Sequence, residues 1–206
     1  MFIVMKEKLI YIWEEHKLLL LAAALIAALP GIFWSDFFSP DNKETAFCAV
    51  VVGQGYDYDR EKMLARQTLA ALGLDEKKEQ VVVDLSLEPQ LDAEGVPPES
   101  AYLDQMKMTM YLTGGEGDVV VSDETVLSHY NGLGAAADLR DIFSEEELMA
   151  WEDSVFAEQA GTDEIPRALR ISGDFAGAGE TYVWVSKKAP HMELVGDFIR
   201  ALCGLS

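Results

Sequence analysis

The feature that most constrains this chain is a run of uncharged, mostly apolar residues at positions 18–35, between Lys17 and Asp36. A helix needs about 20 such residues to span a bilayer, with a working range of about 17–25. Aromatic side chains, which are enriched at both interfaces of a membrane, lie at the two ends of the run. They are Tyr11, Trp13, Phe33, Trp34, Phe37 and Phe38. We therefore predict a transmembrane helix at 18–38, preceded by a segment at 1–17.

Two other interpretations of this run stay open: a cleaved signal peptide and a buried core helix. The apolar part of a secretory signal is typically about 7–15 residues long and ends at small residues. Here the small residues 22–24 lie in the middle of the run, and bulky aromatic residues follow Leu29. The pattern favours a retained anchor.

Basic residues predict the orientation of the anchor. Lys6, Lys8 and Lys17 precede the run, whereas Lys43 is the only basic residue in the twenty or so positions that follow Leu29. Because positive flanks stay on the cytoplasmic side, the N-terminus is expected there. We expect a cell-membrane protein with one span, a linker at 39–45 and an extracytoplasmic domain at 46–206.

The chain is strongly acidic, with 36 acidic and 16 basic side chains and a formal net charge of -20. Such a field repels phosphate backbones and anionic lipid head groups. A nucleic-acid partner is therefore not expected. A cationic ligand or a basic partner surface is favoured over an anionic one.

Alternating strand and helix patterns predict the fold of the outer domain. Continuous apolar runs at 46–52, 80–87 and 118–121 are typical of strands buried on both faces. Helical periodicity follows each of the first two, at 59–74 and 99–112, and Ser122 or Asp123 can cap a helix after the third. We expect an α/β fold with an open, mostly parallel sheet and helices on both faces.

The second half of the domain is less regular. Ser144 and Glu147 have the spacing of a capping box and predict a helix that extends to about residue 156. A loop at 157–166 and a strand at 167–172 are expected next. The pattern then predicts a strand at 180–186 and a terminal helix at 192–202.

Two segments resemble extracellular, periplasmic-type solute-binding proteins of ABC importers: 117–121 with 137–143, and 182–188 with 193–202. The second segment is similar to the returning strand and following helix of that family. About 160 residues suffice for only one of its two lobes. The N-terminal segment also looks like uncharacterised single-span membrane proteins of Gram-positive bacteria. The resemblance implies a membrane-tethered, single-lobe relative that binds a small solute or serves a transporter subunit as an accessory.

Ligands of open parallel sheets bind beyond the carboxyl ends of the strands, which selects the loops after the predicted strands. The candidate ligand-binding residues after the first and third strands are Gln54, Tyr56, Asp57, Tyr58, Ser122, Asp123 and Thr125. A third loop, 87–98, carries further acidic residues. The competing interpretation is that these side chains cap helices, lie in their first turns or are simply solvated.

No pattern predicts catalysis. HExxH, GxSxG and P-loop motifs are missing, so we expect no catalytic residues, metal or cofactor, and no enzyme activity. Cys48 and Cys203 are either separate buried thiols or, in an outward-facing domain, a disulfide. The sequence predicts a membrane-anchored extracytoplasmic binding domain. The alternative is a structural or protein-interaction module on the same fold without a ligand pocket.

Overall fold

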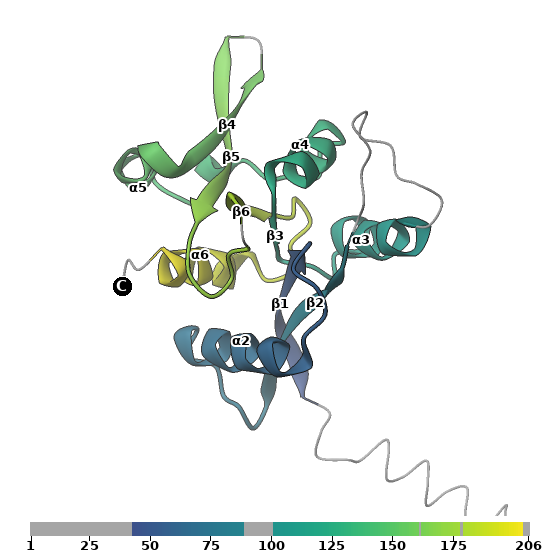
Figure 1. The fold of residues 1–206 in the computed structure, drawn as a ribbon. Helices are drawn as coiled ribbons and strands as arrows, with labels where there is room; N and C mark the ends of the chain where they lie inside the picture. Colours follow the sequence, from purple (N-terminus) through teal and green to yellow (C-terminus); the bar gives the residue numbers. More distant parts are fainter. Residues whose placement is uncertain (1–42, 89–100, 161, 178, 204–206) are drawn as a thin grey trace, which may run out of the picture. The chain divides into compact units, whose positions relative to one another are not determined.

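The computed structural model describes residues 43–88, 101–160, 162–177 and 179–203, which form an α/β domain around one open sheet of six strands (Figure 1). The strand order is β2-β1-β3-β6-β5-β4. The predicted segment 1–17, the predicted transmembrane helix 18–38 and most of the linker lie outside the described residues. Within the described ranges, no helix has the length and apolar character that a membrane span requires.

The first half of the sheet is parallel, as the apolar runs predicted. β1 (Glu44–Val52) pairs in parallel with β2 (Glu79–Leu87) on one side and with β3 (Val119–Ser122) on the other. The three strands are followed by α2 (Tyr58–Ala71), α3 (Tyr102–Gly114) and α4 (Glu124–Gly132). Most side chains of these strands are buried, which is why their sequences are apolar almost without alternation.

The second half of the sheet is antiparallel, so the prediction of a mostly parallel sheet holds only for β1 to β3. β6 (Thr181–Val185) runs antiparallel to β3 and to β5 (Asp163–Ile171), and β5 runs antiparallel to β4 (Val155–Ala160). The connection between β5 and β6 is shorter than the dozen or more residues that a parallel crossover needs. The chain therefore returns along the sheet in the opposite direction.

The helix predicted from Ser144 to about residue 156 is shorter in the structure. Ser144 and Glu147 do form a capping box, which confirms the helix start, but α5 (Glu145–Ala150) ends six residues early. A 3-10 turn, η3 (Glu152–Ser154), leads directly into β4. The predicted loop 157–166 is also wrong, because β4 pairs with β5 over most of that stretch. Pairing with the sheet overrides the local helical pattern.

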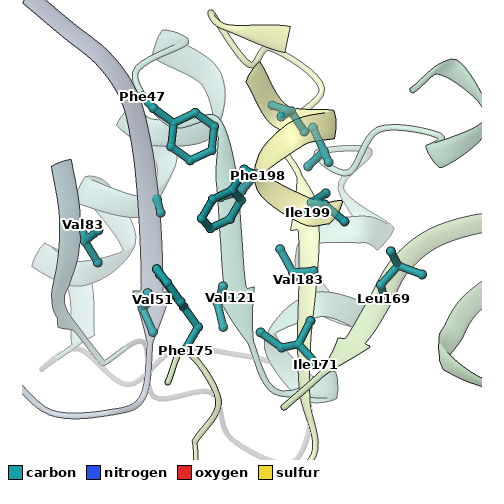
Figure 2. Packing of buried hydrophobic residues seen from close by; sticks show 14 of the residues in the cluster. Phe47, Val51, Val83, Val121, Leu169, Ile171, Phe175, Val183, Phe198 and Ile199 are labelled. Atoms are coloured by element: carbon teal, nitrogen blue, oxygen red, sulfur yellow. The ribbon is translucent and has the colours of Figure 1, made fainter. Parts of the chain in front are cut away.

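Helices cover both faces of the sheet, as predicted. Along β1, Phe47, Ala49 and Val51 face the cluster that contains Leu64 of α2 and Phe198 of α6, with α6 spanning Met192–Leu202. Figure 2 shows this packing of α6 against the strands. The alternate residues of β1 face the cluster under α3 and α4 instead. A second 3-10 turn, η2 (Leu139–Asp141), places Leu139 in the first cluster.

Cys48 and Cys203 do not form a disulfide. Both are free thiols, and they belong to different faces of the sheet. Cys48 lies in the cluster under α3 and α4, whereas Cys203 packs against the cluster under α2 and α6. The disulfide alternative is therefore wrong, because the sheet separates the two side chains.

Candidate functional site

The loop after β1 is held by local and loop–loop contacts. Gln54 Nε2 donates to the carbonyl of Phe175 at 2.7 Å. Asp57 is the N-cap of α2 and accepts from the backbone N–H groups of Asp59 and Arg60. Tyr56 and Tyr58 are exposed. Of the four residues predicted here, Asp57 has the capping role that the competing interpretation gave it.

The loop after β3 is also committed to structure. Ser122 Oγ accepts a hydrogen bond from Trp184 Nε1 at 3.0 Å and donates to the Asp123 carbonyl at 3.0 Å. Asp123 caps α4 by accepting from the Val126 N–H. Thr125 is exposed in the first turn of that helix. None of the seven predicted residues lines the hollow beside His191 described next.

A buried carboxylate links two strands to the start of α6. Asp118, immediately before β3, is fully buried. Its Oδ2 accepts from the Cys48 N–H of β1 at 2.8 Å, and its Oδ1 accepts from the His191 N–H at 2.8 Å. The same Oδ2 lies 3.0 Å from His191 Nδ1. Both carboxylate oxygens are therefore used, so the charged side chain is satisfied in the interior.

The Asp118 contact fixes the donor pattern of the His191 ring. A carboxylate only accepts hydrogen bonds, so a neutral imidazole places its proton on Nδ1. Nε2, on the opposite side of the ring, is then an acceptor. A histidine oriented in this way by a carboxylate is a common feature of binding and catalytic sites.

A second buried carboxylate, Asp84 of β2, lies on the same face of the sheet. Lys107 Nζ is 2.6 Å from Asp84 Oδ2, and the Tyr111 hydroxyl donates to that oxygen at 2.7 Å. Ser86 donates to Oδ1 from both its hydroxyl and its N–H. Burial opposes ionisation of Asp84, but these hydrogen bonds, led by the one from Lys107, outweigh it and lower its pKa to about 2.

The two carboxylate centres adjoin a hollow of about 370 Å³, a size within the range of small-molecule sites. It opens under the α3 face of β1 and β2, next to the turn that precedes α6. Its lining residues are Thr45, Cys48, Val82, Tyr111, Gly115, Glu116, Pro190 and His191. Because Asp118 precedes β3, this site lies toward the amino end of that strand. The sequence analysis instead predicted a site beyond the carboxyl ends of the strands.

The electrostatic environment of the hollow is acidic. Burial, and then the charges of Asp118, Asp84 and Glu116, raise the pKa of the Cys48 thiol to about 12. Burial and the bond to Asp84 likewise raise the pKa of Tyr111. A thiol with so high a pKa stays protonated at neutral pH, so it is a poor nucleophile. The field disfavours an added negative charge and favours a positive one.

In the part of the chain that the structure describes, no three His, Cys, Asp or Glu side chains come together in a way that could hold a metal ion. Comparisons of this chain with family models, curated proteins and solved structures give no match. The chemistry of the hollow therefore has to be inferred from its own residues.

The residues of this site were missed because the fold brings them together from distant positions. Asp118 and His191 are 73 positions apart. One signal was available: Asp84 interrupts the apolar strand run 81–87, and a charge inside a buried strand needs a partner. Lys107 and Tyr111, four positions apart on α3, are such partners.

Proposed function

We propose that this chain is a membrane-anchored extracytoplasmic binding domain and that its ligand, a small organic cation, binds in the hollow beside His191. The observation that carries the proposal is the combination of an oriented imidazole acceptor with nearby acidic side chains, Asp118, Asp84 and Glu116, which add to the effect of burial in raising the pKa of Cys48 to about 12. Hollows with a few convergent polar groups and shifted pKa values are the usual places for ligands.

The chemistry of the lining selects an ammonium group over an anion. His191 in its neutral form offers Nε2 as an acceptor, and Glu116 offers an exposed carboxylate; an ammonium N–H can satisfy both. Lys107 already pairs with Asp84, so its charge is largely committed. Val82 and the Tyr111 ring supply apolar surface for a short carbon chain.

The raised pKa of Cys48 supports binding over catalysis. A nucleophilic thiol next to histidine requires a lowered pKa, and here burial and three acidic side chains act in the opposite direction. The resemblance to one lobe of a solute-binding protein agrees with this reading. The two segments that resemble its returning strand and following helix form β6 and α6. A tethered lobe with a solute site fits an accessory of a transporter.

The proposal is tested by calorimetric titration of the full chain in detergent with n-butylammonium, and with butyrate as the anionic counterpart. The key variant is His191→Asn, because an asparagine amide reproduces the Nδ1 donor toward Asp118 but offers no Nε2 acceptor. His129→Asn, on α4, is the matched control. We expect the parent and the control to bind the amine but not butyrate, and His191→Asn to bind it at least about tenfold more weakly.

Two results would count against a cation site in this hollow. One is equal affinity of the parent and His191→Asn for the amine. The other is preferential binding of butyrate. Unfolding curves of the variants, measured in the same detergent, distinguish lost binding from lost structure.

A second candidate function, a protein-interaction module, is favoured by one surface. α3 exposes Tyr102, Leu103, Met106 and Met110, and Leu103 is 75% exposed. The last three repeat at spacings of three and four residues, so they follow one side of the helix. Cross-linking from a photoreactive residue at Leu103 in cells tests this function. Capture of a single membrane protein, together with no amine binding, would favour the module over the binding domain.

A further inference from the structure

A separate hollow of about 230 Å³ lies between α2, α6 and the connection from β5 to β6. Gln67, Thr68 and Ala71 line it from α2, and Phe198, Ala201 and Leu202 line it from α6. The connection completes the wall with Ser172, Gly173, Asp174 and Phe175. It lies on the face of the sheet opposite to Cys48, so it is independent of the hollow beside His191.

Thr68 is the unusual residue of this hollow. Its side chain is 2% exposed, and its Oγ1 has no hydrogen-bond partner among the described residues. Leaving a buried hydroxyl unpaired is unfavourable, so such groups are uncommon in folded proteins. A threonine in this position is explained if an outside molecule supplies the partner.

Beside the polar side chains of Gln67, Ser172 and Asp174, part of the wall is apolar and aromatic. The rings of Phe175 and Phe198 lie 5.5 Å apart in an edge-to-face arrangement, and the rings of Phe198 and Phe47 lie 4.8 Å apart. Figure 2 shows these three side chains between α6 and the strands. Rings that pack against one another in this way form a fixed surface, against which an aromatic ligand can stack or pack edge-on.

The connection from β5 to β6 is fastened to α2, which holds most of the wall in place without a ligand. Thr68 Oγ1 itself is closed to solvent, so a ligand hydroxyl reaches it through a local shift of the wall. Arg60 Nη2 donates to the Asp174 carbonyl at 2.7 Å, and Gln67 Nε2 donates to the Asp174 carboxylate at 3.3 Å. Gln54 holds the neighbouring carbonyl of Phe175. A preformed site loses less ordering entropy when a ligand binds.

We propose that this hollow binds a small aromatic or aliphatic molecule that carries one hydroxyl group, with the hydroxyl paired to Thr68 Oγ1. Phe175, Phe198 and Leu202 enclose the apolar body of the ligand. A hydroxyl fits Thr68 because each group can both donate and accept. The site is a second ligand position, distinct from the cation site.

The test uses p-cresol and toluene, two probes of similar shape that differ in one hydroxyl. Their affinities for the full chain are measured by ligand-observed NMR titration in detergent. Thr68→Val replaces the hydroxyl by a methyl group of nearly the same size, and Thr125→Val is the matched exposed control on α4. We expect Thr68→Val to weaken the affinity for p-cresol by about tenfold and to leave the affinity for toluene within about twofold of the parent value. The control should change neither affinity.

A second variant keeps the result interpretable. Ala71→Leu fills the hollow from an exposed helix position, so the chain should fold and bind neither probe. His191→Asn should bind p-cresol like the parent, which separates this site from the cation site. The proposal is overturned if p-cresol fails to bind, if Thr68→Val binds it like the parent, or if Ala71→Leu leaves both affinities unchanged.

Discussion

Asp118 Oδ2 lies 3.0 Å from His191 Nδ1, and the same carboxylate accepts the backbone N–H of His191. Through the N–H of Cys48 it also holds β1, so one buried side chain connects the parallel strands β1 and β3 with the start of α6. This connection serves the fold and the proposed site at the same time. It positions the imidazole without any contribution from a ligand.

Asp118→Asn tests how much this connection contributes to the stability of the fold. The substitution replaces one acceptor oxygen of the carboxylate by an NH₂ group, which is a donor. A buried N–H group that Asp118 now satisfies then faces another donor and stays unpaired. We expect the free energy of unfolding to fall by about 3 kcal/mol, measured by urea denaturation. Asp141→Asn, at an exposed position, is the control and should change it by less than about half a kcal/mol. A similarly small change in Asp118→Asn would show that the carboxylate is not needed for folding.

The pH dependence of stability should report on Asp84. Its pKa in the folded chain is about 2, below the ordinary value of 3.8, so the folded state binds fewer protons than the unfolded state between these values. Stability from this group is therefore complete above about pH 4 and is lost as the pH falls toward 2. The shift corresponds to about 2 kcal/mol.

Comparison with Asp84→Asn isolates this group from the other acids, which both proteins share. We expect the free energy of unfolding of the parent to exceed that of the variant by about 2 kcal/mol at pH 6. This difference should shrink to near zero at pH 2. Thermal unfolding across this range provides the measurement. A difference that stays constant with pH would contradict the role of Lys107, Tyr111 and Ser86 in holding the charge.

Sequence reasoning succeeded where local pattern and burial coincide. The apolar runs of β1, β2 and β3 and the amphipathic α6 were predicted close to their observed bounds. It failed at β4, where Glu158, Gln159 and Glu164 make the hairpin look like a loop. The strand exists there because β5, which begins only three residues after β4 ends, offers an edge to pair with.

The candidate site was harder to predict for a different reason, the distance along the chain between its residues. Ligands of parallel sheets bind beyond the carboxyl ends of the strands, and this rule predicted a site in the loops after β1 and β3. In the structure, Asp57 and Asp123 of these loops are helix caps. The His191 site depends on contacts across 73 residues and on an antiparallel return that the rules did not anticipate. Only Asp84, a charge within an apolar strand, marked the correct face from sequence alone.

The thiol of Cys48 should be inert in the folded chain. Burial and the nearby acids raise its pKa to about 12, so little thiolate is present at pH 8. We expect iodoacetamide to leave Cys48 unmodified at this pH until urea unfolds the chain, as read by peptide mass spectrometry. Rapid alkylation of Cys48 in the folded chain would contradict the acidic, enclosed environment that the cation proposal requires.

The membrane placement can be tested by labelling of intact cells. In a Cys203→Ser background, Glu146→Cys places a thiol at an exposed position of α5, and Glu14→Cys places one before the apolar run. An impermeant maleimide should label Glu146→Cys from outside and label Glu14→Cys only after lysis. The reverse pattern, or protection of both positions, would contradict an extracytoplasmic domain.

The most direct measurement of the binding proposal is the NMR spectrum of the histidine rings during titration with n-butylammonium. The chain has three histidines, His16, His129 and His191, so the spectrum contains its own controls. We expect the ring signals of His191 to shift in a saturable way, while those of His16 and His129 stay constant. Two results would contradict a cation site beside Asp118. In one, the amine shifts the signals of His16 and His129 but not those of His191; in the other, it shifts none of the three.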